Sequence, residues 1–185
     1  AQSEGMHAYL VGGAVRDSLL NRSIVDLDIC VEGDALELAE KLKSTSGAII
    51  LMKSQFLTTR IELADTIIDI ATCRDESYDK PGLLPTVHPS SLEHDLARRD
   101  FTINSMALDI TPTGWGKLID PFSGTTDLDE CIIRSLHEDS FPDDPTRIFR
   151  AIRYSQRLEF SIDASTMHDI SKNTSYIDDL SSDRI

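Results

Sequence analysis

The sequence predicts an α/β (α+β) fold, in which a head with a small mixed sheet and flanking helices is followed by an all-helical neck. Short helix and strand patterns alternate over the first part of the chain, and from Asp143 onward the pattern is helical. The 185 residues suffice for one domain and a small appendage. We therefore expect a head over residues 1–140 and a helical neck over residues 141–185, with the boundary near Ser140.

Hydrophobic periodicity predicts the first elements. Residues 15–20 have a helical pattern, and residues 25–31 alternate aliphatic with polar side chains, as a half-buried strand does. Asp34 is a favourable N-cap for the next helix, which has Ala35 and Leu38 on one face. Three further strands are expected at residues 48–52, 56–63 and 66–72.

Residues 74–98 differ from the rest of the head. The segment contains several prolines and many charged residues without a sustained period, and we interpret it as a long connection that is functional or mobile. Asp100 is then expected to cap a helix that includes residues 103–107. Residues 108–110 and 117–119 are expected to form a hairpin around two glycines.

The charge balance excludes a general attraction of nucleic acid by the whole surface of the protein. The chain has 32 acidic and 18 basic residues and a net charge of −14, and a field of that sign repels RNA and DNA. A nucleic-acid role must therefore depend on local basic patches, on metal ions or on a segment beyond this chain. No apolar stretch approaches the roughly 20 residues of a membrane span, and the three cysteines form no Cys-x-x-Cys pair. We expect a soluble, cytoplasmic protein.

Two aspartates in the second predicted element are the first candidates for chemistry. Successive strand residues face opposite ways, so Asp26 and Asp28 project to the same side. Two adjacent carboxylates repel each other, and bound Mg²⁺ relieves this repulsion; the alternative is two solvated aspartates on an exposed face. Asp69 interrupts an apolar run, where a charge is costly unless it is paired or bound to metal. If its strand neighbours the first, Asp69 becomes a third catalytic carboxylate of a two-metal site.

A glycine pair precedes the first predicted helix. Gly12 and Gly13 allow backbone N–H groups to approach an anion closely, and Arg16 adds a guanidinium within the first turn. The alternative is an ordinary turn, but Gly13 stands only 13 residues before Asp26, close enough to present a phosphate to the same metals. The pattern therefore predicts a phosphate-binding loop.

The start of the neck has a second set of candidates. Arg147, Arg150 and Arg153 recur every three residues and predict a basic stripe, for which a solvated face is the alternative. Asp144 is a helical neighbour of Arg147. A carboxylate accepts from an exocyclic amino group and a guanidinium donates to a ring acceptor, so this pair matches the Watson–Crick edges of cytosine and adenine. Uracil and guanine present a keto oxygen instead, so the pair predicts a protein template for C and A.

Adjacent arginines at positions 98 and 99 are unusual in so acidic a chain. They indicate an anion to be bound. An ion pair of Arg98 or Arg99 with Asp95 or Asp100 is the alternative.

Together these segments resemble the nucleotidyltransferases of the CCA-adding enzyme and bacterial poly(A) polymerase family, within the DNA polymerase β superfamily. The resemblance extends from about residue 9 to residue 185, and its four motifs are LVGGAVRD (10–17), DLD (26–28), RRDFTIN (98–104) and DDPTR (143–147). The family motif often has Glu where this chain has Asp143. Residue by residue, the resemblance implies that Asp26 and Asp28 are Mg²⁺ ligands and that Asp144 and Arg147 are a base-selecting pair. It also implies nucleotide contacts by Gly12, Gly13, Arg16 and Arg99, and further nucleotide contacts by Arg150 and Arg153.

The reaction that the resemblance implies is attack by the 3′-hydroxyl of a tRNA on the α-phosphate of CTP or ATP, with release of pyrophosphate. Two metal ions suit this chemistry. The long segment 74–97 disfavours CC-only addition, whereas A-only addition and poly(A) synthesis stay open. We expect the main tRNA contacts in helical domains beyond residue 185. A non-catalytic nucleotide-binding regulatory module and a Mg²⁺-dependent phosphohydrolase are the alternatives from other classes.

Overall fold

The computed structural model describes residues 5–80 and 82–181. Residues 1–4, 81 and 182–185, which belong to the ends of the predicted head and neck and to the predicted connection, lie outside it. Within the described residues, one mixed sheet has seven strands, in which β2 and β5 are parallel and all other neighbours antiparallel. In sheet order they are β3 (Ile49–Ser54), β4 (Thr58–Leu63), β5 (Thr66–Thr72), β2 (Leu27–Glu32), β1 (His7–Val11), β8 (Ala107–Asp109) and β9 (Leu118–Ile119). The predicted mixed sheet is thereby confirmed.

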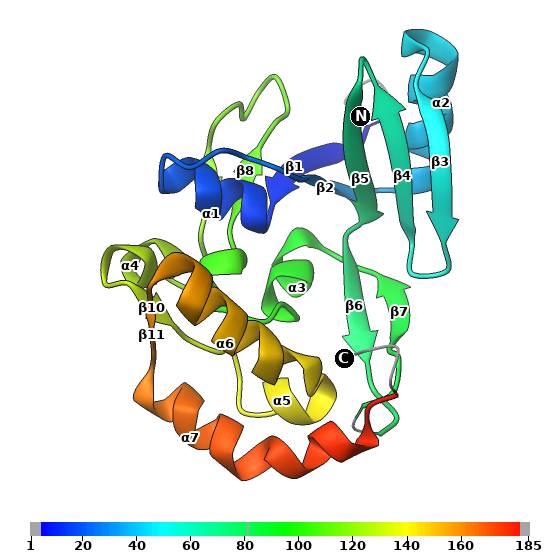
Figure 1. The fold of residues 1–185 in the computed structure, drawn as a ribbon. Coiled ribbons are helices and arrows are strands. Elements are labelled where there is room, and N and C mark those ends of the chain that lie inside the picture. Colours follow the sequence, from blue (N-terminus) through cyan, green and yellow to red (C-terminus); the bar gives the residue numbers. More distant parts are fainter. Residues whose placement is uncertain (1–4, 81, 182–185) are drawn as a thin grey trace.

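Helix α2 (Ala35–Ser46) covers one face of this sheet (Figure 1). Asp34 caps it as predicted, because its carboxylate accepts hydrogen bonds from the backbone N–H of Leu36 at 2.8 Å and of Glu37 at 3.1 Å. Val31 of β2 is packed in the α2 core. Since strand residues alternate, Cys30 faces the opposite side and joins the cluster around α3 (Leu92–Ala97). That opposite side is the one that faces the neck.

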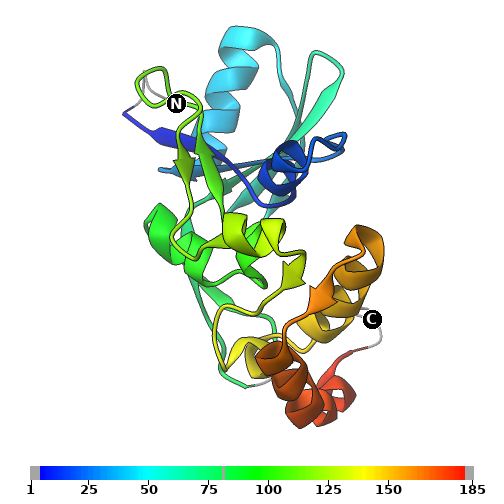
Figure 2. The ribbon, with the colours of Figure 1, turned by 90° about the vertical axis from the view of Figure 1, so that its left-hand side faces the viewer.

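A second core joins the head to the neck. Phe101 and Ile133 pack in one buried cluster with Phe141 and Ile148, so apolar contacts cross the predicted boundary near Ser140. The boundary itself stays a prediction. Figure 2 shows the sheet at one end of the molecule and the last helices at the other. The elements that complete the chain are α1 (Gly13–Leu19), α4 (Gly124–Asp129), β10 (Ile132–Ile133), α5 (Ser140–Asp143), α6 (Thr146–Leu158), β11 (Ser161–Ile162), α7 (Ala164–Asn173) and the 3₁₀ turn η3 (Thr174–Asp179).

The neck contains a short strand in addition to its helices. Glu159 ends α6 in the left-handed conformation, at φ 63°, and β11 then pairs in parallel with β10 of the head. The structure therefore does not confirm an all-helical neck. Two residues are too few for a periodic pattern, so this pairing depends on where the packed helices place the chain.

Residues 74–98 are more regular than predicted. They form the antiparallel pair β6 (Arg74–Ser77) and β7 (Thr86–Pro89), followed by α3. All four residues of β6 and two of the four of β7 are polar, so no sustained hydrophobic alternation marks these strands. The segment is thus more than the long connection that its missing periodicity indicated, and its functional or mobile character stays a prediction.

Two boundaries also differ from prediction. The strand expected over residues 25–31 begins at Leu27, and Val25 is 78% exposed instead of lying on the aliphatic face. Asp100 caps no α-helix: a single 3₁₀ turn, η2 (Thr102–Asn104), leads directly into β8. The hairpin expected around the two glycines is present as β8 and β9.

In the described part of the chain, every helix is too short or too polar to cross a membrane.

The shared core predicts the unfolding behaviour. Phe141 is fully buried in the cluster common to head and neck, so Phe141→Ala should lower the free energy of unfolding by about 3–5 kcal/mol. Ile152→Ala, at an exposed position of α6, is the matched control and should change it by less than about 0.5 kcal/mol. Urea titration followed by circular dichroism measures both. Two separate transitions, with only one shifted by Phe141→Ala, would contradict a common core.

Candidate active site

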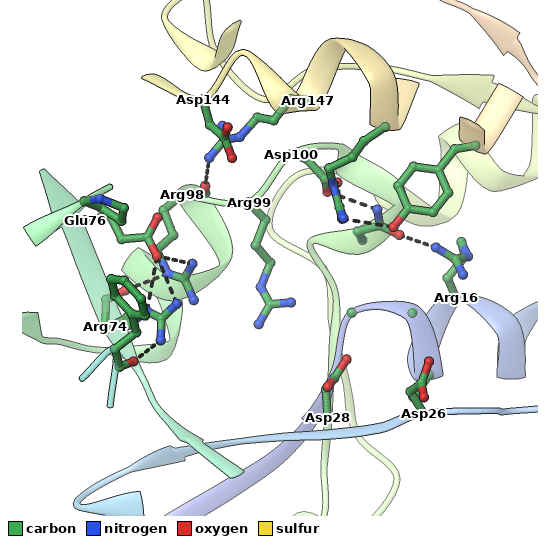
Figure 3. Close-up of a pocket in the computed structure, with 18 of the residues that line it drawn as sticks. Arg16, Asp26, Asp28, Arg74, Glu76, Arg98, Arg99, Asp100, Asp144 and Arg147 are labelled. Atoms are coloured by element: carbon green, nitrogen blue, oxygen red, sulfur yellow. Dashed lines mark hydrogen bonds and ion pairs between the residues drawn. The ribbon is translucent and has the colours of Figure 1, made fainter. Parts of the chain in front are cut away.

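A pocket of about 550 Å³ lies between the head and α6 (Figure 3). Residues from five separate parts of the chain line it: the start of α1 with the turn before it, residues 25–28 at the start of β2, Phe56 between β3 and β4, the segment from β6 to η2, and residues 144–157 at and within α6. Nine of the eleven predicted site residues are among them: Gly12, Gly13, Arg16, Asp26, Asp28, Arg99, Asp144, Arg147 and Arg150. Asp69 and Arg153 are not in the lining.

Asp26 and Asp28 both face this pocket, as Figure 3 shows. Burial raises the pKa of Asp28; Arg99 opposes the rise, and the negative charges of Asp69 and Asp26 add to it. A divalent cation would relieve this unfavourable burial of negative charge. The carboxylate oxygens are hard donors of the kind that Mg²⁺ prefers, so the residues present fit that ion.

Asp69 lies next to Asp28, as the prediction required, because the two are paired in register on β5 and β2. Its two carboxylate oxygens, however, accept hydrogen bonds from Arg60, Nε at 2.8 Å and Nη2 at 2.7 Å. The charge inside the apolar strand is thus neutralised by an ion pair. Among the described residues, no group of three or more acidic, histidine or cysteine side chains is arranged to hold a metal ion. A third-ligand role for Asp69 stays a prediction that this arrangement does not favour.

Gly12 allows the backbone to approach the centre of the pocket closely. It has φ 67° and ψ −131°, in the region that favours glycine. A Cβ atom at this position would lie 3.0 Å from Nη1 of Arg99 and 3.9 Å from Oδ2 of Asp28. A side chain here would therefore displace the guanidinium that faces the carboxylate pair.

Arg16 lines the pocket but is largely occupied by the protein. It is 2% exposed, and its guanidinium donates to both oxygens of Asp17, at 2.8 and 3.0 Å, and to Oδ1 of Asn104 at 2.6 Å. The ring of Tyr154 lies beneath it, with its centroid 5.1 Å from Cζ. These contacts hold the loop before α1 in place. The predicted phosphate contact of Arg16 stays a prediction.

The two adjacent arginines share one buried carboxylate. Asp95 is fully buried and accepts from Nη2 of Arg98 at 2.6 Å and from Nη2 of Arg99 at 2.7 Å. Burial by itself raises the pKa of Asp95, but the guanidinium groups of Arg99 and Arg98 outweigh it and hold the pKa below its usual value. The alternative of an ion pair between these arginines and Asp95 is therefore present in the structure, although Asp95 is buried.

Arg99 keeps donor capacity for an anion. Its side chain extends toward Asp28 (Figure 3), and its Nε is a buried atom without a hydrogen-bond partner in the described structure. A buried donor left unpaired is costly. The guanidinium itself lines the pocket, so the structure brings a cationic group with an unpaired donor next to the carboxylate pair.

Arg98 links this centre to the hairpin β6–β7. Its Nη1 donates to Glu76 at 2.7 Å, and the same carboxylate accepts from Arg74 at 3.1 Å and from the hydroxyl of Tyr78 at 2.7 Å. Arg74 and Glu76 were not predicted as site residues, because polar residues in a segment without periodicity have no local signal of function.

Asp144 and Arg147 lie at the far side of the pocket, at the start of α6 (Figure 3). Oδ1 of Asp144 accepts from the backbone N–H of Thr146 at 3.1 Å and from its hydroxyl at 2.7 Å. Arg147 is 5% exposed and donates through Nη1 to Ser140 at 2.8 Å and through Nη2 to the carbonyl of Arg98 at 2.7 Å. The two side chains of the predicted base-selecting pair are thus both held by neighbours within one pocket.

The predicted stripe of three arginines is only partly correct. An α-helix turns by about 100° per residue, so Arg153 points about 120° away from Arg147, whereas Tyr154 and Arg157 return to within about 80° of it. Tyr154 and Arg157 line the pocket, and Arg153 is exposed outside it. Helical geometry would have identified both missed residues. Arg150 lines the pocket and donates to Asp100, with Nη2 2.6 Å from the carboxylate.

The chain is similar in sequence to nucleotidyltransferases that act on tRNA, according to their names. A family model described as the poly A polymerase head domain matches residues 8–134. The A-adding tRNA nucleotidyltransferase of Aquifex aeolicus (strain VF5) is 45% identical over 161 residues, 87% of this chain and 20% of that protein. The CCA-adding enzyme of Lactobacillus johnsonii (strain CNCM I-12250 / La1 / NCC 533) is 35% identical over 187 residues, 98% of this chain and 44% of that protein. The chain thus spans less than half the length of these two relatives.

Solved structures agree with the fold. An apo form of a CCA-adding enzyme has a TM-score of 0.92 and 42% identity, and the match covers 99% of this chain and 44% of that one. A tRNA nucleotidyltransferase complexed with a primer tRNA and an incoming ATP analog has a TM-score of 0.88 and 38% identity, over 100% of this chain and 52% of that one.

Asp95 is the residue whose removal should damage the pocket most. Asp95→Asn leaves two buried guanidinium groups without their shared charge, so we expect a loss of about 3–5 kcal/mol in the free energy of unfolding at pH 7. Because the folded pKa of Asp95 is lowered, its stabilisation is present above its unfolded pKa and is lost as the pH falls through the folded pKa. The difference between the two proteins should therefore narrow below about pH 4.

Chemical denaturation at a series of pH values measures this difference. Asp129→Asn, at an exposed position of α4, is the matched control and should leave stability within about 0.5 kcal/mol. A constant difference between pH 7 and pH 3 would show that the charge of Asp95 is not what stabilises the arginines.

Proposed function

The chain belongs to the poly A polymerase head-domain family, and we propose that it is the catalytic head of an RNA nucleotidyltransferase. The proposed reaction adds AMP and CMP, from ATP and CTP, to the 3′ end of a tRNA and releases pyrophosphate. One observation carries the proposal: a single pocket is lined by the carboxylates Asp26 and Asp28 and by the pair Asp144 and Arg147. The first pair suits phosphoryl chemistry and the second suits recognition of a base.

Asp144 and Arg147 select the base. The carboxylate accepts from the exocyclic amino group that cytosine and adenine share, and the guanidinium donates to the ring acceptor beside it. Uracil and guanine would place a keto oxygen against the carboxylate. Both side chains are anchored by neighbouring groups, so they present one fixed donor and acceptor pattern to an incoming base.

Asp26 and Asp28 would hold Mg²⁺, which when bound lowers the pKa of an attacking hydroxyl and neutralises the charge of a leaving pyrophosphate. Because both lie on the sheet side of the pocket, we expect the charged end of a nucleotide there and its base toward α6. The guanidinium of Arg99, which lines the pocket on the side of these carboxylates (Figure 3), binds phosphate oxygens and offsets their negative charge. The backbone of Gly12 leaves the space that this contact requires.

The proposal leaves a choice between addition of both CMP and AMP and addition of AMP alone. Three relatives named A-adding tRNA nucleotidyltransferase are 43–48% identical to this chain, against 35–37% for four named CCA-adding enzyme. This observation favours addition of AMP alone as the second candidate. The base-selecting pair does not separate the two activities, because adenine and cytosine share the edge that it recognises.

The tRNA is the proposed partner, bound mainly by surfaces outside this chain. The net charge of −14 opposes RNA binding by the whole surface, while arginines concentrate in the pocket. A cytoplasmic location is also proposed. All three cysteines are free, in keeping with a reducing compartment.

The test is incorporation of labelled nucleotide by the full-length protein. We would offer tRNAs that lack the whole CCA end, the final CA or only the final A, each with CTP or ATP. Ordered addition of both nucleotides is expected for CCA synthesis, and AMP on the last substrate alone for A addition. Long A tails would indicate poly(A) synthesis, and free inorganic phosphate without a longer RNA a hydrolase.

Asp28→Asn is the matched variant for this assay. Removal of one charge from the carboxylate pair should lower kcat by about a thousandfold or more, because stabilisation by metal is worth several kcal/mol in such reactions. Nucleotide binding through the α6 side of the pocket should persist in equilibrium titration. Full activity of Asp28→Asn would exclude the proposed role of the pair. No incorporation by the unaltered protein, with nucleotide binding intact, would favour a regulatory module.

A further inference from the structure

We infer that Ser140 is a specificity-determining positioning residue: its hydroxyl orients the guanidinium of Arg147, and this orientation sets the preference for C and A over U and G. The inference deepens the proposed function and rests on it. Ser140 is outside the pocket lining and does not touch an incoming base. Its side chain acts through Arg147.

Ser140 is the first residue of α5 and is fully buried. Its Oγ accepts from Nη1 of Arg147 at 2.8 Å, while the carbonyl of Arg98 accepts from Nη2 at 2.7 Å. The guanidinium is planar, so two anchors on different nitrogens fix both its position and the direction of its plane. With only the carbonyl contact left, the group could rotate about that one hydrogen bond.

Ser140 also contacts the other member of the base-selecting pair. Its backbone carbonyl accepts from the N–H of Asp144 at 3.3 Å, in the single turn of α5. The same residue therefore holds Asp144 by its main chain and Arg147 by its side chain. A side-chain substitution breaks only the second contact, which separates the orientation of Arg147 from the folding of the turn.

In this inference, the remaining N–H donors of Arg147 recognise the base. A guanidinium has five N–H groups, and the two hydrogen bonds to Ser140 and Arg98 leave donors for a base in the pocket that Arg147 lines. Discrimination between bases depends on direction, because a donor aimed at a ring acceptor is misplaced by a small rotation. Loss of the anchor should therefore affect the ratio between nucleotides more than the overall rate.

The experiment measures kcat/KM of the full-length protein for single additions of CMP, AMP, UMP and GMP to its tRNA substrate. For Ser140→Ala we expect the ratio of correct to incorrect nucleotide to fall by about tenfold, the usual effect of losing one hydrogen bond to a charged group. Ser140→Cys keeps the size and a weak acceptor and should recover part of the ratio. Equilibrium binding of CTP against UTP provides a second readout, in which Ser140→Ala should narrow the difference in Kd.

Ser105→Ala is the matched control. Ser105 is equally buried and donates its hydroxyl proton to the backbone carbonyl of Leu96, so the substitution also removes a buried hydroxyl hydrogen bond but leaves Arg147 untouched. It should leave the nucleotide ratio unchanged. A general loss of packing would change stability in both variants and the ratio in neither.

The outcomes separate this inference from the function on which it rests. The role of Ser140 would be overturned if the unaltered protein discriminates between nucleotides and the Ser140→Ala and Ser140→Cys proteins discriminate equally well. The proposed function would then still stand. If Ser140→Ala does not fold, an unchanged ratio in Ser140→Cys decides against the inference in the same way. No incorporation by the unaltered protein would overturn the proposed function and this inference with it.

Discussion

The buried carboxylate of Asp95 is the contact on which the rest of the pocket depends. It holds Arg98 and Arg99 side by side against their mutual repulsion. Arg99 then faces Asp26 and Asp28, and the carbonyl of Arg98 accepts a hydrogen bond from Arg147 of α6. One negative charge that is removed from water thus fixes the sheet side of the pocket relative to the α6 side.

The packing of the neck against the head also fixes the two sides of the pocket relative to each other. A template made of side chains selects a base only if its distance from the reacting phosphate is constant, because a shift of about 1 Å is costly in such sites. The common apolar cluster and the pairing of β10 with β11 attach α6 to the head. In the proposed function, this attachment of α6 to the head (Figure 1) would keep the base-selecting side chains at a constant distance from the reacting phosphate.

The charge of the molecule is distributed unevenly. A net charge of −14 repels RNA, yet the pocket is lined by several arginines that are each paired with a carboxylate or a carbonyl of the protein. These pairs hold the cationic groups in fixed directions, and a nucleotide would meet donors that need little reorganisation. Pairing inside the pocket and repulsion outside it would favour binding of a nucleotide in the pocket over the rest of the described surface.

Local sequence patterns were sufficient for most of the longer helices and strands of the head, since strand alternation and the cap at Asp34 are local properties. The motif spacings also united Asp26, Asp28, Asp144 and Arg147 in one hypothesis about a site. The remaining features depend on the tertiary structure. The ion pair of Asp69 with Arg60, the burial of Asp95 and the anchoring of Arg147 join residues of different elements. Such contacts depend on which strands and helices become neighbours, and no local pattern contains that information.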